Sequence, residues 1–177
     1  MKIRFWRTLA AGLAAVLVLA CCTACQGDDA LPAALGVDPK LGQVADHWDD
    51  HGGMGNDGSA YWEVAFSPEE AAALERTLPA AEGWQPLPLS DEARRLLYGT
   101  DGVEETGEGA FLSMGPYLTQ QDGSPLFPQV EEGCWFFYDK QTGAYTAEGV
   151  KERPSYNFIA ALYDPAAHTL YCGELDT

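Results

Sequence analysis

Basic residues are scarce in this sequence, and their scarcity excludes one broad class of function. Of 177 residues, 10 are Lys or Arg and 27 are Asp or Glu, which gives a formal net charge of −17 at pH 7. A surface this acidic repels the phosphate backbone of DNA and RNA. We therefore expect no nucleic-acid partner.

Long hydrophobic runs are also scarce, because only one uncharged apolar segment occurs, from Leu9 to Ala20. Without a second such run the chain is not a multi-span membrane protein. The remaining composition, 46% hydrophobic and 21% charged, is typical of a packed globular protein. The length leaves room for one domain of ordinary size.

Recognisable catalytic motifs are missing as well. No G-x-S-x-G occurs, and His168 follows a predicted turn without an obvious Ser or Cys partner. The carboxylates are too numerous to single out a glycosidase pair. We therefore expect a protein that is not an enzyme and that holds no cofactor.

The first 25 residues have the pattern of an export signal. Lys2, Arg4 and Arg7 precede the apolar segment of 12 residues, Leu9 to Ala20. A spanning helix needs about 20 apolar residues, so this segment is short for a membrane anchor and fits a signal peptide. Residues 1–25 are therefore predicted to direct the chain out of the cytoplasm.

Three cysteines at the end of this segment resemble the start of a bacterial lipoprotein. Cys21 and Cys25 each follow a small residue, as an acylated cysteine does, and either one fits. Two acyl chains hold a protein stably on a membrane. We predict a lipid anchor at the extracytoplasmic face, a flexible tether over residues 26–39 and one domain over residues 40–177. Cleavage removes three basic residues and no acidic one, so the charge of −17 becomes −20.

The first half of the domain shows both helix and strand signals. Asp38 and Pro39 predict the start of a short helix that ends at Gly52 and Gly53. Ser67, Pro68 and Glu70 form a capping box that begins a helix ending at Pro79, and Ser90 begins another that Gly99 ends. The predicted strands in this half are residues 60–66 and the two-proline segment 84–89.

The C-terminal third predicts an antiparallel meander. Apolar and aromatic runs cover residues 134–138, 156–163 and 169–175, and Asp164-Pro165 supplies a hairpin turn between the last two. The fold class is therefore α+β: a mostly antiparallel sheet of four to five strands with one or two covering helices. Residues 115–132, with three prolines, are expected on the surface. The expected core consists of Val64, Phe66, Leu74, Leu78, Trp135, Phe137, Phe158, Ala160, Leu162 and Leu170.

Several segments together resemble a group of small, uncharacterised exported proteins of Gram-positive bacteria that are often lipoprotein-like. These are residues 51–58 ahead of a strand, the run Trp84-Gln85-Pro86-Leu87-Pro88-Leu89, and the closing runs Ser155-Tyr156-Asn157-Phe158, Leu162-Tyr163-Asp164, Thr169-Leu170-Tyr171 and Glu174-Leu175-Asp176-Thr177. The resemblance covers most of residues 50–177. It implies one exported domain and no established activity, and members carry tyrosines where Cys134 and Cys172 stand.

Two histidines spaced four apart raise the possibility of a metal site. On a helix His47 and His51 share a face, as in H-E-x-x-H zinc proteases, and Asp57 stands at the place of a third ligand. However, Trp48 stands where the general base is needed, and Gly52 breaks the helix. Asp49, Asp50, Asn56 and Asp57 are an alternative set of calcium ligands, without EF-hand spacing. We assign no metal site on this evidence.

Cys134 and Cys172 are the two cysteines outside the leader, and both fall in predicted strands. In an exported protein they form a disulfide if their strands are neighbours in register. The alternative is two buried free thiols.

The sequence leaves three candidate functions. The main expectation is a lipid-anchored binding or accessory module at the cell surface. One alternative is a metal-dependent hydrolase that uses His47, His51 and Asp57. The other is an inhibitor or immunity-type protein, whose acidic surface suits a basic partner.

Overall fold

The computed structural model describes residues 30–38, 40–52, 55–100, 104–105, 111–112 and 115–177. Leu31–Thr177 forms a compact unit. The described residues of this unit form two hydrophobic cores. Cys21 and Cys25 lie outside the described residues.

No helix within the described ranges has both the length and the apolar character needed to cross a membrane.

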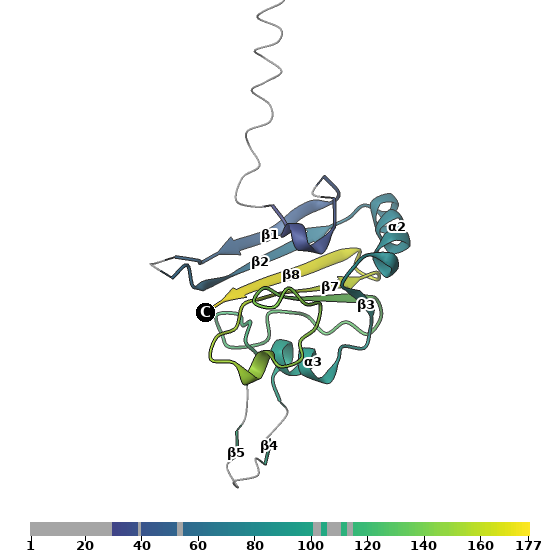
Figure 1. Cartoon of the computed structure of the whole chain (residues 1–177). Coiled ribbons are helices and arrows are strands. Elements are labelled where there is room, and N and C mark those ends of the chain that lie inside the picture. The colour runs from purple at the N-terminus through teal and green to yellow at the C-terminus, as the bar shows by residue number, and fades with distance from the viewer. Residues whose placement is uncertain (1–29, 39, 53–54, 101–103, 106–110, 113–114) are drawn as a thin grey trace, which may run out of the picture. The chain divides into compact units, whose positions relative to one another are not determined.

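Six antiparallel strands form the main sheet, in the order β1-β2-β8-β7-β6-β3 (Figure 1). Their bounds are β1 (Gln43–Asp49), β2 (Gly58–Ala65), β3 (Trp84–Pro86), β6 (Cys134–Asp139), β7 (Phe158–Asp164) and β8 (Thr169–Asp176). Two short strands, β4 (Glu104–Glu105) and β5 (Phe111–Leu112), pair separately. The helices are α2 (Pro68–Thr77) and α3 (Asp91–Tyr98), with 3-10 turns η1 (Ala33–Leu35), η2 (Leu78–Ala80) and η3 (Val150–Glu152).

The predicted α+β class, the antiparallel meander and the C-terminal hairpin are confirmed. β6 pairs with β7, and β7 pairs with β8 through the turn after Asp164. The helices predicted at Ser67 and Ser90 both form, and each begins at its predicted cap. The Ser67 side chain accepts from the backbone N–H of Glu70 and completes a capping box, while Ser90 accepts from Ala93.

The number of strands was underestimated, because the segment predicted to be a helix after Asp38 contains β1. Val44 lies opposite Val64 of β2, and Trp48 lies opposite Tyr61. The apolar residues at 41, 44 and 48 suggested a helical face, but pairing with a neighbouring strand prevails over such a short local pattern. Gly52 and Asp57 bridge at the tip of this hairpin, where Asn56 has a positive φ of 56°.

The domain also begins earlier than the predicted boundary at residue 40. Leu35, expected in the tether, is 1% exposed and belongs to the core beneath α2. Its carbonyl oxygen accepts a 2.9 Å hydrogen bond from Nε1 of Trp84. Residues 31–37 are therefore part of the folded domain.

Both faces of the sheet are buried, so the expected core divides into two. One core lies against α2 and η1 and includes Val64, Phe136 and Leu170. The other lies against α3 and the chain around residues 118–127 and includes Phe137 and Leu162. Successive strand residues point to opposite faces, so neighbours such as Phe136 and Phe137 enter different cores. All ten expected core residues are buried.

A buried carboxylate closes the end of β6. Asp139 is 2% exposed, and Arg153 lies 3.0 Å from its Oδ2 atom. Asp139 also accepts hydrogen bonds from the Thr142 hydroxyl and the backbone N–H of Gln141. Burial favours the protonated acid, but the hydrogen bonds and the Arg153 charge outweigh it and lower the pKa of Asp139.

We predict that Asp139→Asn destabilises the domain in a pH-dependent way. The lowered pKa of Asp139 contributes stability above the unfolded-state pKa of about 4, and this contribution is lost as the pH falls through the folded-state pKa. The variant should be less stable by about 3 kcal/mol at pH 7, because Arg153 loses its charged partner. Urea unfolding at pH 7 and pH 3 measures the difference, which should shrink at pH 3. An equal difference at both pH values would contradict this role.

Candidate functional site

His47, His51 and Asp57, all within the described ranges, are not arranged to hold a metal ion together. In an extended chain residues four apart are separated by about 13 Å, and β1 holds His47 in such a chain. The His47 ring stacks on Trp62 with centroids 5.0 Å apart, and its Nδ1 atom lies 2.8 Å from the Tyr61 carbonyl oxygen. Asp57 is exposed in the hairpin tip. The shared helical face that the alternative hydrolase set of His47, His51 and Asp57 requires does not form, because His47 lies in β1.

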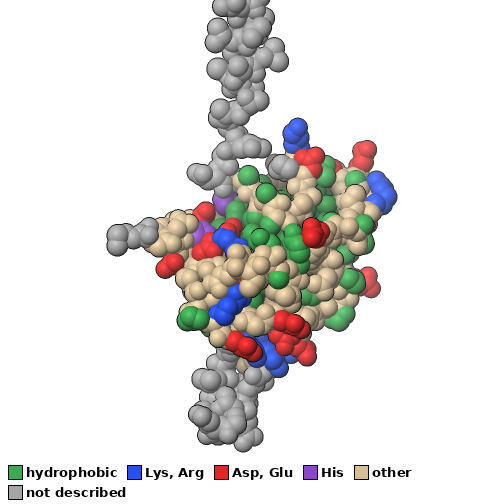
Figure 2. Space-filling model, viewed as in Figure 1, with side chains coloured by type: hydrophobic (Ala, Val, Ile, Leu, Met, Phe, Trp, Pro, Cys, Tyr) green, Lys and Arg blue, Asp and Glu red, His purple; other side chains and the backbone are tan. Residues whose placement is uncertain are grey.

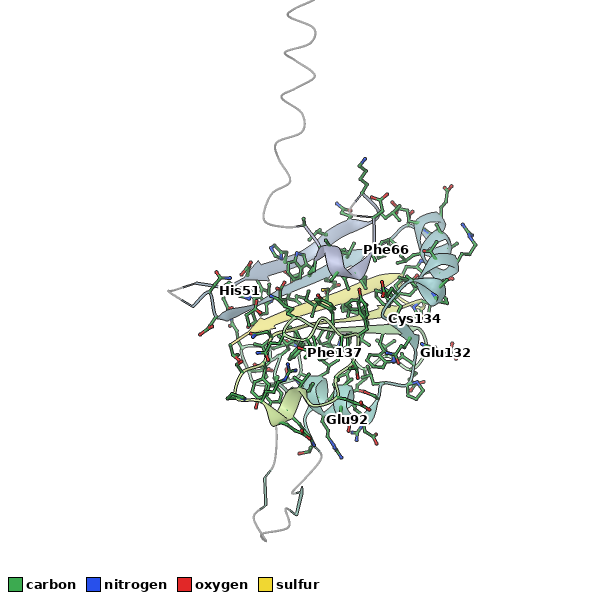
Figure 3. The ribbon with its side chains drawn as sticks, in the orientation of Figure 1. His51, Phe66, Glu92, Glu132, Cys134 and Phe137 are labelled. Carbon is green, nitrogen blue, oxygen red and sulfur yellow. The ribbon has the colours of Figure 1, made fainter. Side chains whose placement is uncertain are left out.

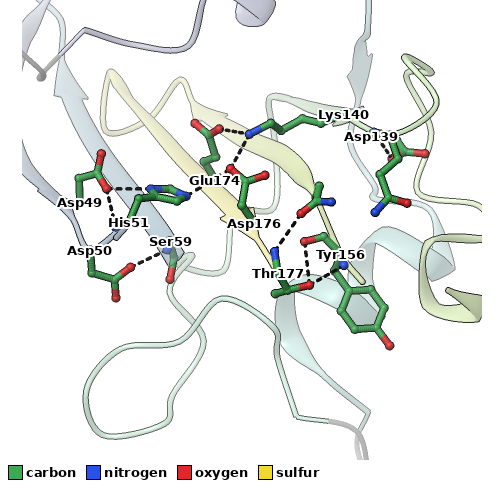
Figure 4. Close-up of polar contacts among 12 residues, drawn as sticks. Asp49, Asp50, His51, Ser59, Asp139, Lys140, Tyr156, Glu174, Asp176 and Thr177 are labelled. Atoms are coloured by element: carbon green, nitrogen blue, oxygen red, sulfur yellow. Dashed lines mark hydrogen bonds and ion pairs between the residues drawn. The ribbon is translucent and has the colours of Figure 1, made fainter. Parts of the chain in front are cut away.

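His51 instead belongs to a polar network between β1 and the C-terminal strand (Figure 4). Its Nδ1 atom lies 2.7 Å from Oδ1 of Asp49. Its Nε2 atom lies 3.3 Å from Oδ2 of Asp176, an ion-pair distance without hydrogen-bond geometry. Lys140 binds the carboxylates of both Asp176 and Glu174. In Figure 2 histidine, acidic and basic side chains adjoin at this end of the sheet.

The electrostatics of this network favour the charged forms of Asp49 and Lys140. Hydrogen bonds from His51, first from its backbone N–H, lower the pKa of Asp49. Burial acts to lower the pKa of Lys140, but its bonds to Asp176 and Glu174 prevail and raise it. These residues lie in or just after β1, β6 and β8, so the network ties the end of the sheet together.

No trio of His, Cys, Asp or Glu in the described ranges is arranged to hold a metal ion. The candidate calcium ligands are already engaged: Asp49 binds His51, and Asp50 accepts from the backbone N–H of Ser59. Asn56 and Asp57 are exposed in the hairpin tip.

Of the two alternatives for Cys134 and Cys172, the disulfide does not form, and both cysteines are free thiols, Cys172 buried and Cys134 partly so. Cys134 lies opposite Tyr163, and Cys172 lies opposite Ala161, so β7 separates them. Two strand spacings amount to about 9.6 Å, beyond the roughly 7 Å that a disulfide spans. Burial raises the pKa of both thiols, Cys172 more strongly, and so disfavours the reactive thiolate form. Figure 3 shows Cys134 at the opposite end of the sheet from His51.

A concave site does occur beside α3, and we call it the α3 pocket. It has a volume of about 690 Å³. Four parts of the chain form its walls: the segment after β3, the helix α3, the segment 125–131 and the strand β7. The lining residues are Leu87, Pro88, Leu89, Arg94, Tyr98, Gly99, Pro125, Gln129, Val130, Glu131 and Leu162.

Hydrogen bonds join the walls of the α3 pocket. The Tyr98 hydroxyl donates to the carbonyl oxygen of Pro128 at 2.7 Å, which links α3 to the segment 125–131. The backbone N–H of Leu87 donates to the carbonyl oxygen of Gly133 at 3.1 Å. Burial raises the pKa of Tyr98 to about 12, so its hydroxyl stays protonated at neutral pH and keeps donating.

Sequence reasoning missed this pocket. The proline-rich segment 115–132 was expected to lie on the surface, yet Leu118 and Phe127 are buried at 1% and 3% exposure. These anchors hold the following residues against α3. The one available signal was the pair of prolines in the segment 84–89, which keeps that wall extended.

Comparisons with known proteins found no matching family model, no similar curated protein and no similar solved structure.

Proposed function

We propose that this chain is a lipid-anchored binding module at the extracytoplasmic face of a bacterial membrane. In this proposal Cys21 or Cys25 carries the acyl chains, and the α3 pocket binds a small ligand. The export-signal pattern of residues 1–25 supports the extracytoplasmic location. The compact unit Leu31–Thr177, with its two hydrophobic cores, supports a folded binding domain.

The pocket is the observation that carries the binding role. Its volume of about 690 Å³ falls within the roughly 300–1,000 Å³ of small-molecule sites. Leucine, proline, valine and tyrosine side chains predominate in its lining, with a few polar groups, as in such sites. The described lining includes no His, Cys or Ser, so it supports binding over nucleophilic catalysis.

The neutral dye Nile red tests the site, because its fluorescence rises in apolar surroundings. Residues 26–177 should bind it saturably. Val130→Lys should weaken binding about tenfold, because losing an apolar side-chain contact costs about 1.5 kcal/mol. The matched control is Val44→Lys on β1, where the valine is 43% exposed and does not line the pocket. Equal binding by both variants would place the dye elsewhere and refute the proposed site.

A further inference from the structure

Arg94 brings a positive charge to the wall of the α3 pocket. Its side chain is exposed, and it makes no hydrogen bond or ion pair with any residue in the described ranges. By contrast, Lys140 and Arg153 each bind carboxylates of the domain. In a chain with 27 acidic residues, Arg94 keeps its charge available to a ligand.

The helix α3 fixes the position of Arg94. Ser90 caps the helix, and Ala93, Leu96 and Leu97 anchor it in the core at 0–1% exposure. A guanidinium group stays charged at all ordinary pH values and binds a carboxylate through two parallel hydrogen bonds. The helix therefore places the Arg94 backbone at the pocket wall, and the long side chain is ordered only when the ligand pairs with it.

Glu131 is the one acidic residue of the described lining, and it would favour a cation instead. It is exposed and lies next to Glu132, which is exposed too. Such a pair is well solvated and belongs to a segment between elements rather than to a helix. Arg94, which stands on a helix anchored in the core, is therefore the recognition group that we assign.

We propose that the α3 pocket binds a small amphipathic carboxylate. Its apolar body contacts Leu87, Leu89 and Val130, and its carboxylate pairs with Arg94. This inference rests on the proposed function, because it requires that the pocket is a binding site.

Three ligands with the same decyl chain test the head group by displacing Nile red from residues 26–177. Decanoate should displace the dye at about fivefold lower concentration than decanol, the upper range for a partly exposed ion pair. Decylamine should be the weakest. Arg94→Gln should remove the advantage of decanoate and leave decanol unchanged. Arg76→Gln is the control, because Arg76 is exposed on α2, the helix that packs on the other core, and does not line the pocket.

The outcomes separate this inference from the proposed function. Equal displacement by decanoate and decanol, unchanged in Arg94→Gln, overturns the carboxylate assignment and leaves the pocket in place. If decylamine displaces the dye best, the carboxylate assignment is wrong and Glu131 is the group that recognises the ligand. If none of the three ligands displaces the dye, the proposed ligand class is wrong. If, in addition, Val130→Lys does not weaken Nile red binding, the proposed binding site is refuted as well.

Discussion

Phe136→Ala and Phe137→Ala should each destabilise the domain by about 3 kcal/mol or more. Both side chains are fully buried, at 0% exposure. Phe136 packs with Trp84 in the core beneath α2, and Phe137 stacks on Phe158 in the core beneath α3, with centroids 5.0 Å apart. Truncating a buried phenylalanine to alanine removes its apolar burial and leaves a cavity, which typically costs about 3–5 kcal/mol.

Chemical denaturation of the two variants tests whether both faces of the sheet are covered. In a sheet with one solvated face, one of two successive residues would be nearly neutral to truncation. Val44→Ala is the control, because this partly exposed side chain should cost less than about 0.5 kcal/mol. A large loss for Phe137→Ala beside a small loss for Phe136→Ala would show that α2 and η1 do not cover the sheet.

Sequence signals predicted correctly the elements that depend on hydrogen bonds between a side chain and the backbone a few residues away. The capping box at Ser67 and the cap at Ser90 specify helix starts by hydrogen bonds that the sequence itself reveals. The turn after Asp164 likewise specifies a hairpin, because the Asp164 side chain accepts hydrogen bonds from the backbone N–H groups of Ala166 and Ala167. These features depend little on the rest of the fold.

β1 was not predictable in this way, because its stability comes from a partner. Residues 43–49 are mostly exposed and acquire their strand conformation by pairing with β2. The four-residue spacing of His47 and His51 has metal-binding meaning only on a helix. The incorrect prediction of a helix after Asp38 therefore underlies the alternative metal site at His47, His51 and Asp57.

The α3 pocket was equally beyond sequence reasoning, for a different reason. Its walls join residues 87–99 with residues 125–131, which are distant in the chain. Their meeting depends on the buried anchors Leu118 and Phe127 and on the bond from Tyr98 to Pro128. The pocket exists only after these segments pack together, and no local sequence pattern predicts it.

Replacing both Cys21 and Cys25 with serine should release the protein from the membrane fraction. A serine hydroxyl does not replace the thiol that accepts the lipid, so the exported chain would keep no acyl chains. The mature domain then has no force holding it to the bilayer, since its formal charge of −20 is repelled by anionic lipids. Radiolabelled palmitate and membrane fractionation of the producing bacterium measure both effects.

Single variants identify the acylated residue. If Cys25 is the site, Cys25→Ser abolishes labelling while Cys21→Ser retains it, and the reverse holds if Cys21 is the site. Cys22→Ser is the matched control, because Cys22 has the same chemistry and follows Cys21 rather than a small residue. Undiminished labelling in the double variant would rule out both positions.

The most direct test of the anchored module is the intact mass of the wild-type protein extracted from bacterial membranes. We predict a chain that starts at Cys21 or Cys25 and carries the added mass of a diacylglyceryl group. A full-length chain of 177 residues, unmodified and recovered from the cytosol, would contradict both the anchor and the location.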